Sequence, residues 1–432
     1  MVTKNSSMVA DIHISNPASA PTRGMFRALW HRNFRIIWLG AVLSNVGTWM
    51  QTLAQGYLVY ELTRSSWWLG VDGFMATAPS LVLTLLGGVL ADLIDRRRLL
   101  ILTQTGAGLS ALVLAALVYT HTVQVWMILG LSFVTGCCMS LAGPSFQAMT
   151  LDLAGREDLS NAIALNSAQF QLSRVIGPAL AGLFLAVWGT AACFFANSLS
   201  FVAVIIALCA VRLPDKANPL TKGATRQRLR LRALWDDLTA GFRYVRQRPR
   251  VFWLLLVATV NTFFGAAYLS QLPLFARDVW HAGETGLSFL MAASGAGAFS
   301  GALLLAFADD FRRKGRAVLI AAFIFGLGVV GFASSPRWQV ALLFLFVMGM
   351  AGVGAFAVTN TLVQQLVTDE MRGRVMSMLI LTFVGVMPFS SLAVGALAKQ
   401  IGAPHTLALG GIVIMLFSIL VALTNKKLRD AA

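Results

Sequence analysis

Residues 87–98 read GGVLADLIDRRR and separate two long uncharged stretches, as a tight polar turn between two membrane spans would. The glycines carry no side chain, so two helices can approach closely there. Asp92 would lie at the membrane surface, with Arg96 and Arg97 shortly after it. Such a carboxylate can pair with an arginine, or with the N-terminus of a neighbouring helix, where the helix dipole favours negative charge. We interpret the turn as a gate, although any short cytoplasmic loop also carries arginines.

The composition of the whole chain is that of a membrane protein. Hydrophobic residues make up 57% of it and charged residues only 12%, against about a quarter charged in soluble proteins. A helical span needs roughly 20 apolar residues, and uncharged runs of that size recur along the chain. We predict an all-α polytopic membrane protein with twelve transmembrane helices in two six-helix bundles, at about 34–62, 67–91, 99–121, 123–151, 161–188, a sixth span ending at 211, 251–276, 285–308, 317–335, 338–367, 374–398 and 403–425.

The net charge of +16 is distributed in a way that argues against a nucleic-acid partner. With the N-terminus placed inside, 29 of the 34 Lys and Arg fall on the inner side, four fall in outer loops, and Arg174 falls within a span. Because cytoplasmic loops carry the excess of Lys and Arg, we predict an inner-membrane protein with both termini in the cytoplasm. Its basic surface would face anionic lipid head groups.

Six spans, a basic linker and six more spans predict two halves. We expect a disordered cytoplasmic tail at 1–30, a first bundle at 31–212, a linker at 213–250, a second bundle at 251–425 and a cytoplasmic tail at 426–432. The first tail has no apolar core of the kind found in signal peptides. In the linker, an amphipathic helix is predicted to lie on the inner membrane surface, with one apolar face formed by Leu234, Leu238, Phe242 and Val245.

An offset of 217 residues supports a duplication of the halves. It relates three pairs of residues, namely Asp92 and Asp309, Asp152 and Asp369, and Gln147 and Gln364. The turn containing Asp309, Arg312 and Arg313 would then be the counterpart of the opening motif. We expect Asp92 and Asp309 each to lie at the cytoplasmic face, within reach of the other half, so that the two turns act as symmetric gates.

Two intramembrane charges are candidates for ion coupling, because such charges are costly in a bilayer. Asp72 is the one acid placed inside a span, and Arg174 is the one base. Counting along the helices from opposite faces puts the two at similar depths in a hydrocarbon core of about 30 Å. A buried pair that separates during transport would couple protons to movement. Alternatively, Arg174 bonds to carbonyl groups and Asp72 sits in the wet outer mouth.

The opening stretch resembles the signature between helices 2 and 3 of the major facilitator superfamily, and departs from it at Leu93 and Asp95. The resemblance covers about residues 30–425, and the most similar branch is the transmembrane secretion effector family, which contains enterobactin and macrolide exporters. It implies two parallel six-helix halves and a gating motif formed by Gly88, Asp92, Arg96, Arg97, Asp152, Asp309, Arg312, Arg313 and Asp369.

A second motif lies in the predicted fifth span. Gly177, Pro178 and Gly182 are similar to the Gly-Pro signature in helix 5 of the superfamily's antiporters, with Ala181 in place of one glycine. The proline removes an amide that would bond to the carbonyl group of Arg174, and its ring crowds that carbonyl. The motif therefore marks a kinked, closely packed helix, which either contributes to antiport or is purely structural.

The resemblance also implies that spans 1, 4, 7 and 10 line a substrate cavity. Because these spans carry no buried acid, we expect a large apolar or amphiphilic substrate. Each polar side chain there can alternatively join two helices by a hydrogen bond. The candidate cavity residues are Gln51, Gln55, Gln147, Asn261, Tyr268, Asn360 and Gln364.

The sequence shows no motif of an enzyme. It contains no P-loop, HExxH motif, nucleophile elbow or dinucleotide fingerprint, and its four cysteines fall in apolar runs that predict neither disulfides nor a metal site. We expect no cofactor and a monomeric protein. The leading hypothesis is a proton-coupled exporter of a drug-like molecule or siderophore. An importer of a small metabolite, or a non-transporting scaffold or lipid-handling protein, is the alternative.

Overall fold

The structure is a computed structural model that describes residues 26–84, 94–211, 231–307 and 313–430. Within these residues it is helical, with no β-strand. Four predicted residues of the opening motif and its repeat, namely Gly88, Asp92, Asp309 and Arg312, lie outside the described residues.

The first half of the chain consists of long apolar helices. Its elements are η1 (Arg27–Trp30), α1 (Arg32–Thr63), α2 (Ser66–Thr77), α4 (Arg96–Tyr119), α5 (Val125–Ala154) and α6 (Leu159–Ala210). Gly189 interrupts α6 with a φ of 76° and a ψ of −177°, which is a backbone conformation that glycine adopts without a Cβ clash. α6 therefore contains the predicted fifth and sixth spans, and the chain reverses direction between them.

The second half has two helical segments that each contain a π-helical turn, one at Phe275–Val279 and one at Leu381–Gly385. Its elements are α7 (Leu231–Gln247), α8 (Pro249–Gly265), α9 (Tyr268–Leu274), η2 (Phe275–Val279), α10 (Gly283–Phe307), α11 (Lys314–Ala333), α12 (Trp338–Leu366), α13 (Asp369–Ile380), η3 (Leu381–Gly385), α14 (Met387–Ile401), α15 (Ala403–Thr424) and α16 (Lys426–Arg429). The segments η2 and η3 are π-helical turns. Such turns often occur at functional sites.

The described helices agree with the predicted spans. Nine of them are long and apolar enough to cross a membrane, and they account for ten predicted spans because α6 contains two. The helices α1 and α2 occupy the positions of the first two predicted spans. The chain is thus a multi-pass helical membrane protein.

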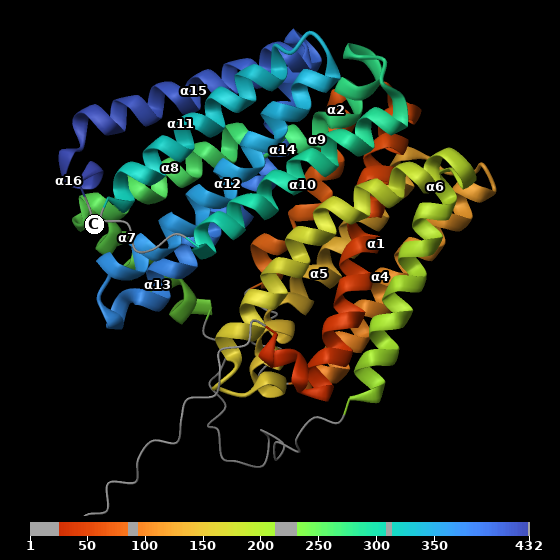
Figure 1. The fold of residues 1–432 in the computed structure, drawn as a ribbon, viewed down its shortest axis with the longest axis horizontal. Helices are drawn as coiled ribbons and strands as arrows, with labels where there is room; N and C mark the ends of the chain where they lie inside the picture. The colour runs from red at the N-terminus through yellow and green to blue at the C-terminus, as the bar shows by residue number, and fades with distance from the viewer. Residues whose placement is uncertain (1–25, 85–93, 212–230, 308–312, 431–432) are drawn as a thin grey trace, which may run out of the picture.

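The two halves share an apolar core at one face of the molecule and have separate cores at the other. Leu53 and Phe194 of the first half belong to the same buried cluster as Leu272 and Phe332 of the second. Figure 1 shows the helices converging there and diverging toward the start of α1 and the end of α15. We call the diverging side, which holds the start of α1 and the end of α15, the terminal face, and the other side the opposite face. Near the terminal face, the cluster around Leu100 and that around Leu254 each draw on one half only.

Small residues bring the halves together at the opposite face. On α2, a Cβ added to Gly70 would lie 2.5 Å from the carbonyl oxygen of Ser391 on α14. On α6, a Cβ added to Gly182 would lie 2.3 Å from Oγ of Ser288 on α10. Backbone approach of this kind is how helices pack in lipid, where the hydrophobic effect does not drive helix association.

The helix α7 packs against α13. Gly241 lies against Arg374 and Met378, and Val245 is buried. Phe242 is 57% exposed. The side chains of Leu234 and Leu238 lie outside the described part of α7. Contact of the predicted apolar face with the membrane surface stays a prediction.

Replacing Gly70 with Val should lower the melting temperature of the purified protein. The added side chain would press on the backbone of α14, and overpacking costs about 1–3 kcal/mol, which is a shift of a few degrees. The matched control is Gly130→Val, since nothing lies within 4 Å of a Cβ added at Gly130. Equal melting temperatures for the two variants would contradict the described α2–α14 contact.

Candidate functional site: a polar cavity between the halves

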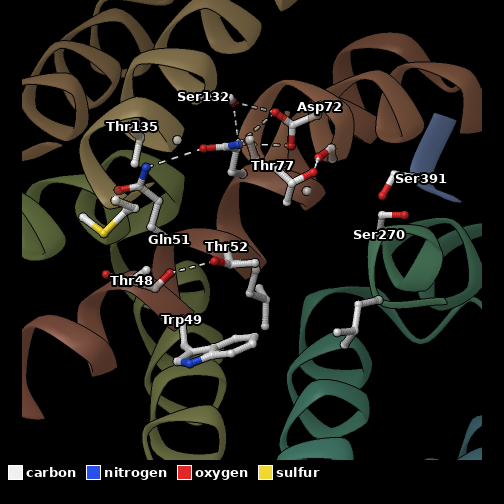
Figure 2. A pocket seen from close by; sticks show the side chains of 18 of the residues that line it. Thr48, Trp49, Gln51, Thr52, Asp72, Thr77, Ser132, Thr135, Ser270 and Ser391 are labelled. Atoms are coloured by element: carbon white, nitrogen blue, oxygen red, sulfur yellow. Dashed lines mark hydrogen bonds between the residues drawn. The ribbon is translucent and has the colours of Figure 1, made fainter. Parts of the chain in front are cut away.

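A cavity of about 410 Å³ lies between the two halves. Its lining comes mainly from α1, α2, α5 and α6, and the second half contributes residues of α9, α10 and α14. In Figure 2, Ser270 and Ser391 of the second half lie across from Thr77 and Asp72 of the first half. A cavity of this volume is in the range that holds a drug-sized molecule.

The helix α1 contributes the largest part of the lining because of its sequence spacing. Asn45, Thr48, Thr52 and Gln55 recur at intervals of three or four residues, which places them on one helix face. Trp49 and Gly56 flank the same face. α1 therefore presents a polar stripe to the cavity with an aromatic ring at its edge.

Asp72 is the centre of the polar side of the cavity. Its Oδ1 and Oδ2 accept hydrogen bonds from Nε2 of Gln55 at 2.9 and 3.0 Å. Oγ of Ser132 donates a further bond to Oδ1 at 2.6 Å and lies 2.9 Å from Nε2 of Gln55. Side chains from α1, α2 and α5 thus meet at one carboxylate, as Figure 2 shows for Asp72 and Ser132.

A series of amide side chains extends this network along α1 and to the part of α6 that follows Gly189. Nε2 of Gln51 donates to Oε1 of Gln55 at 3.5 Å, and Oε1 of Gln51 accepts from Nδ2 of Asn197 at 2.6 Å. Oγ of Ser200 then donates to Oδ1 of Asn197 at 2.9 Å. Hydrogen bonds thus connect the carboxylate of Asp72 through Gln55 and Gln51 to Asn197 of α6.

Arg174 has other partners than Asp72 in this structure. Its guanidinium lies 5.1 Å from the centroid of the Trp49 ring, and Nη1 is 3.4 Å from Oε1 of Gln171. Its backbone carbonyl lies against Gly295 of the second half. The structure thus gives Asp72 the partners Gln55 and Ser132, and it does not pair Asp72 with Arg174.

Two of the seven predicted cavity residues, Gln51 and Gln55, line the described cavity. The other five lie elsewhere. The hydroxyl of Tyr268 is buried and 2.7 Å from Oγ of Ser294, and Nε2 of Gln364 donates to Oδ1 of Asn360 at 2.6 Å. Gln147 is exposed, and Oδ1 of Asn261 is buried without a partner. Tyr268 therefore joins α9 to α10 by a hydrogen bond, as the alternative to a cavity role predicted.

The described part of the gating motif forms an ion pair in the first half. Nη1 of Arg96 is 2.9 Å from Oδ2 of Asp152, which joins the start of α4 to the end of α5. Arg97 donates to the carbonyl oxygen of Cys209 at 2.7 Å, and Asp95 accepts from the amide of Arg98 as the N-cap of α4. These contacts fix the three helix ends α4, α5 and α6 to one another.

The second half does not repeat this arrangement. The offset of 217 residues relates Arg96 to Arg313 and Asp152 to Asp369. Arg313 is exposed as the residue before α11, and Asp369 pairs with Arg372 on its own helix. The described residues of the two motifs thus make different contacts.

The Gly-Pro motif serves the packing of α6 on α1. A Cβ added to Gly177 would lie 2.6 Å from Cβ of Trp49 and 2.7 Å from the carbonyl oxygen of Val46. Pro178 is inside α6. Gly182, one turn further on, faces α10 of the other half. The motif therefore sets the position of Trp49 at the edge of the cavity.

A cluster at the opposite face was missed by the sequence analysis. Arg277 of η2 lies 3.1 Å from Oε1 of Glu61 on α1, and its guanidinium is 5.8 Å from the Tyr57 ring centroid. The neighbouring Asp278 accepts from the hydroxyl of Tyr60 and is 3.8 Å from Arg64. We call these six residues the opposite-face cluster. Four members lie at the end of α1, and the other two, Arg277 and Asp278, lie in η2. The two segments are more than two hundred residues apart, so only the fold brings them together.

Replacing Arg277 with Gln should loosen closure at the opposite face. The pair is partly exposed, so its loss should cost no more than about 1 kcal/mol, and closure should weaken severalfold. The readout is the rate at which an impermeant thiol reagent, added at the opposite face, labels a Ser270→Cys protein that lacks the four native cysteines. The matched control is the exposed Arg337→Gln. An unchanged labelling rate would argue against a closing role.

An exchange of charges should test the Arg96–Asp152 pair. Arg96→Asp would place two carboxylates side by side, so we expect transport to fall at least severalfold. Adding Asp152→Arg restores opposite charges in reverse order and should recover part of the activity. Transport in vesicles at equal protein content is the measurement. Failure of the double variant to exceed the single one, with both in the membrane, would count against the ion pair.

Comparison with known proteins places this architecture among transporters. A family model described as transmembrane secretion effector matches residues 23–432. Macrolide efflux protein A of Streptococcus pyogenes is 24% identical over 404 residues, which is 92% of this chain and 97% of the relative. The staphyloferrin A transporter of Staphylococcus aureus is 24% identical, covering 89% and 94%. Enterobactin exporter EntS of Shigella flexneri is 28% identical, covering 80% of each chain.

Solved structures show the same fold at low sequence identity. A POT family transporter crystallised with a thioalcohol-conjugated peptide has a TM-score of 0.72 at 10% identity, covering 92% of this chain and 96% of its own. The nucleoside transporter NupG has a TM-score of 0.71 at 13% identity, covering 91% and 99%. The all-α transporter fold predicted from the sequence is thereby confirmed, while the count of twelve transmembrane helices stays a prediction.

Proposed function

This chain belongs to the transmembrane secretion effector family of the major facilitator superfamily, and from that premise we propose that it is a proton-coupled exporter of an amphiphilic small molecule. The observation that carries the proposal is Asp72, a carboxylate in a cavity between the halves. Several relatives are named as exporters or efflux proteins. As members of a transporter family they also support the view that the chain is no enzyme.

The two-sided arrangement of the cores supports alternating access. At the opposite face one apolar core joins the halves, and toward the terminal face each half has its own. Rocking about the cavity would open the first interface and close the second. With the terminal face in the cytoplasm, as the distribution of Lys and Arg favours, this state receives substrate from the cytoplasm.

Asp72 is suited to carry the coupling proton. As a carboxylate it accepts bonds from Gln55 and Ser132. When protonated it donates one bond, which the Ser132 hydroxyl can accept after rotation. Protonation thereby removes a charge from the cavity and reverses one bond of the α1–α2–α5 junction. In another state of the cycle, pairing of Asp72 with Arg174 would require Arg174 to leave the Trp49 ring.

We further propose an inner-membrane, monomeric protein with both termini cytoplasmic. The exposed Phe242 and Arg243 of α7 suit contact with anionic lipid head groups. The alternatives from the sequence, an importer of a small metabolite or a non-transporting scaffold, make different demands. An importer would accumulate the compound on the terminal side, and a scaffold would move none.

Asp72→Asn should abolish proton-driven export. In proteoliposomes with the terminal face outward and an acidic lumen, protons flow out as substrate is carried in, so a pH gradient should drive accumulation in the wild-type protein. The variant keeps the size of the side chain and cannot hold the coupling proton, so accumulation should fall at least tenfold. A macrolide serves as the first test compound, with a knockout and overexpression susceptibility screen for others.

The matched control is Glu370→Gln, which removes one exposed acid on α13. Full gradient-driven accumulation by Asp72→Asn would refute Asp72 as the coupling site. Absence of accumulation of every screened compound by the wild-type protein would refute export itself.

A further inference from the structure

The charge of the cavity lining points to a class of substrate. Among the described residues that line the cavity, Asp72 is the only one with an ionisable side chain. The rest are amides, hydroxyls and apolar or aromatic groups, among them Met139, Phe170, Phe201 and Met291. The sequence analysis expected no acid in the cavity, because it assigned Asp72 to a span outside the four lining spans.

The carboxylate of Asp72 can accept another donor. A carboxylate offers about four acceptor positions on its two oxygens. Oδ1 accepts from Gln55 and Ser132, and Oδ2 accepts from Gln55. A bound ammonium group could therefore donate to Oδ2 without displacing the existing partners. Trp49 adds an aromatic ring to the apolar part of the same cavity.

An anionic substrate finds no matching charge in this lining. Arg174 lies over the ring of Trp49 and bonds to Gln171, but it is not part of the lining. A carboxylate or catecholate brought beside Asp72 would face a like charge away from bulk water, where repulsion is strong. Specificity can rest on such repulsion as well as on attraction.

We infer that the cavity selects a substrate with a single positive charge, such as a protonated amine, on an otherwise apolar body, with Asp72 as its counter-ion. The inference rests on the proposed function, because it assigns the substrate class of the same cavity.

Equilibrium binding tests this inference without any gradient. The probes are tetraphenylphosphonium and tetraphenylborate, which share one shape and carry opposite charges. Binding of each to the purified full-length protein is measured in nanodiscs of phosphatidylcholine, with empty nanodiscs as the blank. We expect the cation to bind at least about tenfold more tightly than the anion, which corresponds to about 1.4 kcal/mol.

Three variants locate the preference. Asp72→Asn should weaken cation binding at least about tenfold and leave the anion unchanged or tighter. Glu370→Gln removes an equal charge outside the cavity and should change neither. Arg174→Gln should leave cation binding in place. The wild-type comparison needs no variant, so it decides the matter even if Asp72→Asn fails to fold.

Three results would overturn the inference. The first is equal or tighter binding of tetraphenylborate by the wild-type protein, because the cavity would then not select cations. The second is failure of the wild-type protein to bind the cation, and the third is undiminished cation binding by Asp72→Asn. The binding measurements do not depend on transport. Export of an anion would keep the proposed function and reject the inference. Cation binding without export would keep the inferred charge preference and reject the proposed function.

Discussion

The rest of the site depends on one constraint, which is that a carboxylate at membrane depth must be surrounded by donors that the protein supplies. Water is scarce in the bilayer core, and an uncompensated charge there is costly. Gln55 of α1 and Ser132 of α5 meet this need for Asp72 of α2. Three helices are therefore held at fixed positions by one side chain. The cavity forms where they meet the second half.

The contacts between the halves suit the proposed movement of one half relative to the other. At the opposite face, apolar packing is supplemented by the partly exposed ion pair of Arg277 and Glu61. Exposed pairs contribute little net stability, so they can break and form at low cost. The close contacts at Gly70 and Gly182 are made by backbone and small groups.

The two halves differ in how their helix ends are fixed near the terminal face. In the first half, Arg96 and Asp152 join α4 to α5. In the second half, Lys314 donates to Gln365 at 3.1 Å, which joins α11 to α12, while Asp369 pairs within α13. The residues that the offset of 217 relates, Arg96 to Arg313 and Asp152 to Asp369, thus make different contacts. The described part of the motif serves cohesion within a half.

The sequence by itself determined the membrane class, the order of the spans and the family. These follow from the length and spacing of apolar runs and from short local motifs, because a helix satisfies its own backbone and needs only about 20 apolar residues to cross a bilayer. Gln51, Gln55 and the importance of Asp72 were also accessible, since an acid within a span is rare and the helix face of α1 can be counted.

Only the tertiary structure decided what these residues contact. It placed Asp72 in the cavity beside Ser132, removed Gln364 and Tyr268 from it, and brought Arg277 to Glu61 across more than two hundred residues. The rotation of each helix about its own axis decides which of its side chains face the cavity, and the sequence did not predict that rotation. In lipid, both faces of a span are apolar in composition, so hydrophobic periodicity does not tell which face meets the cavity. Packing between small residues sets that rotation, and the partners lie on other helices.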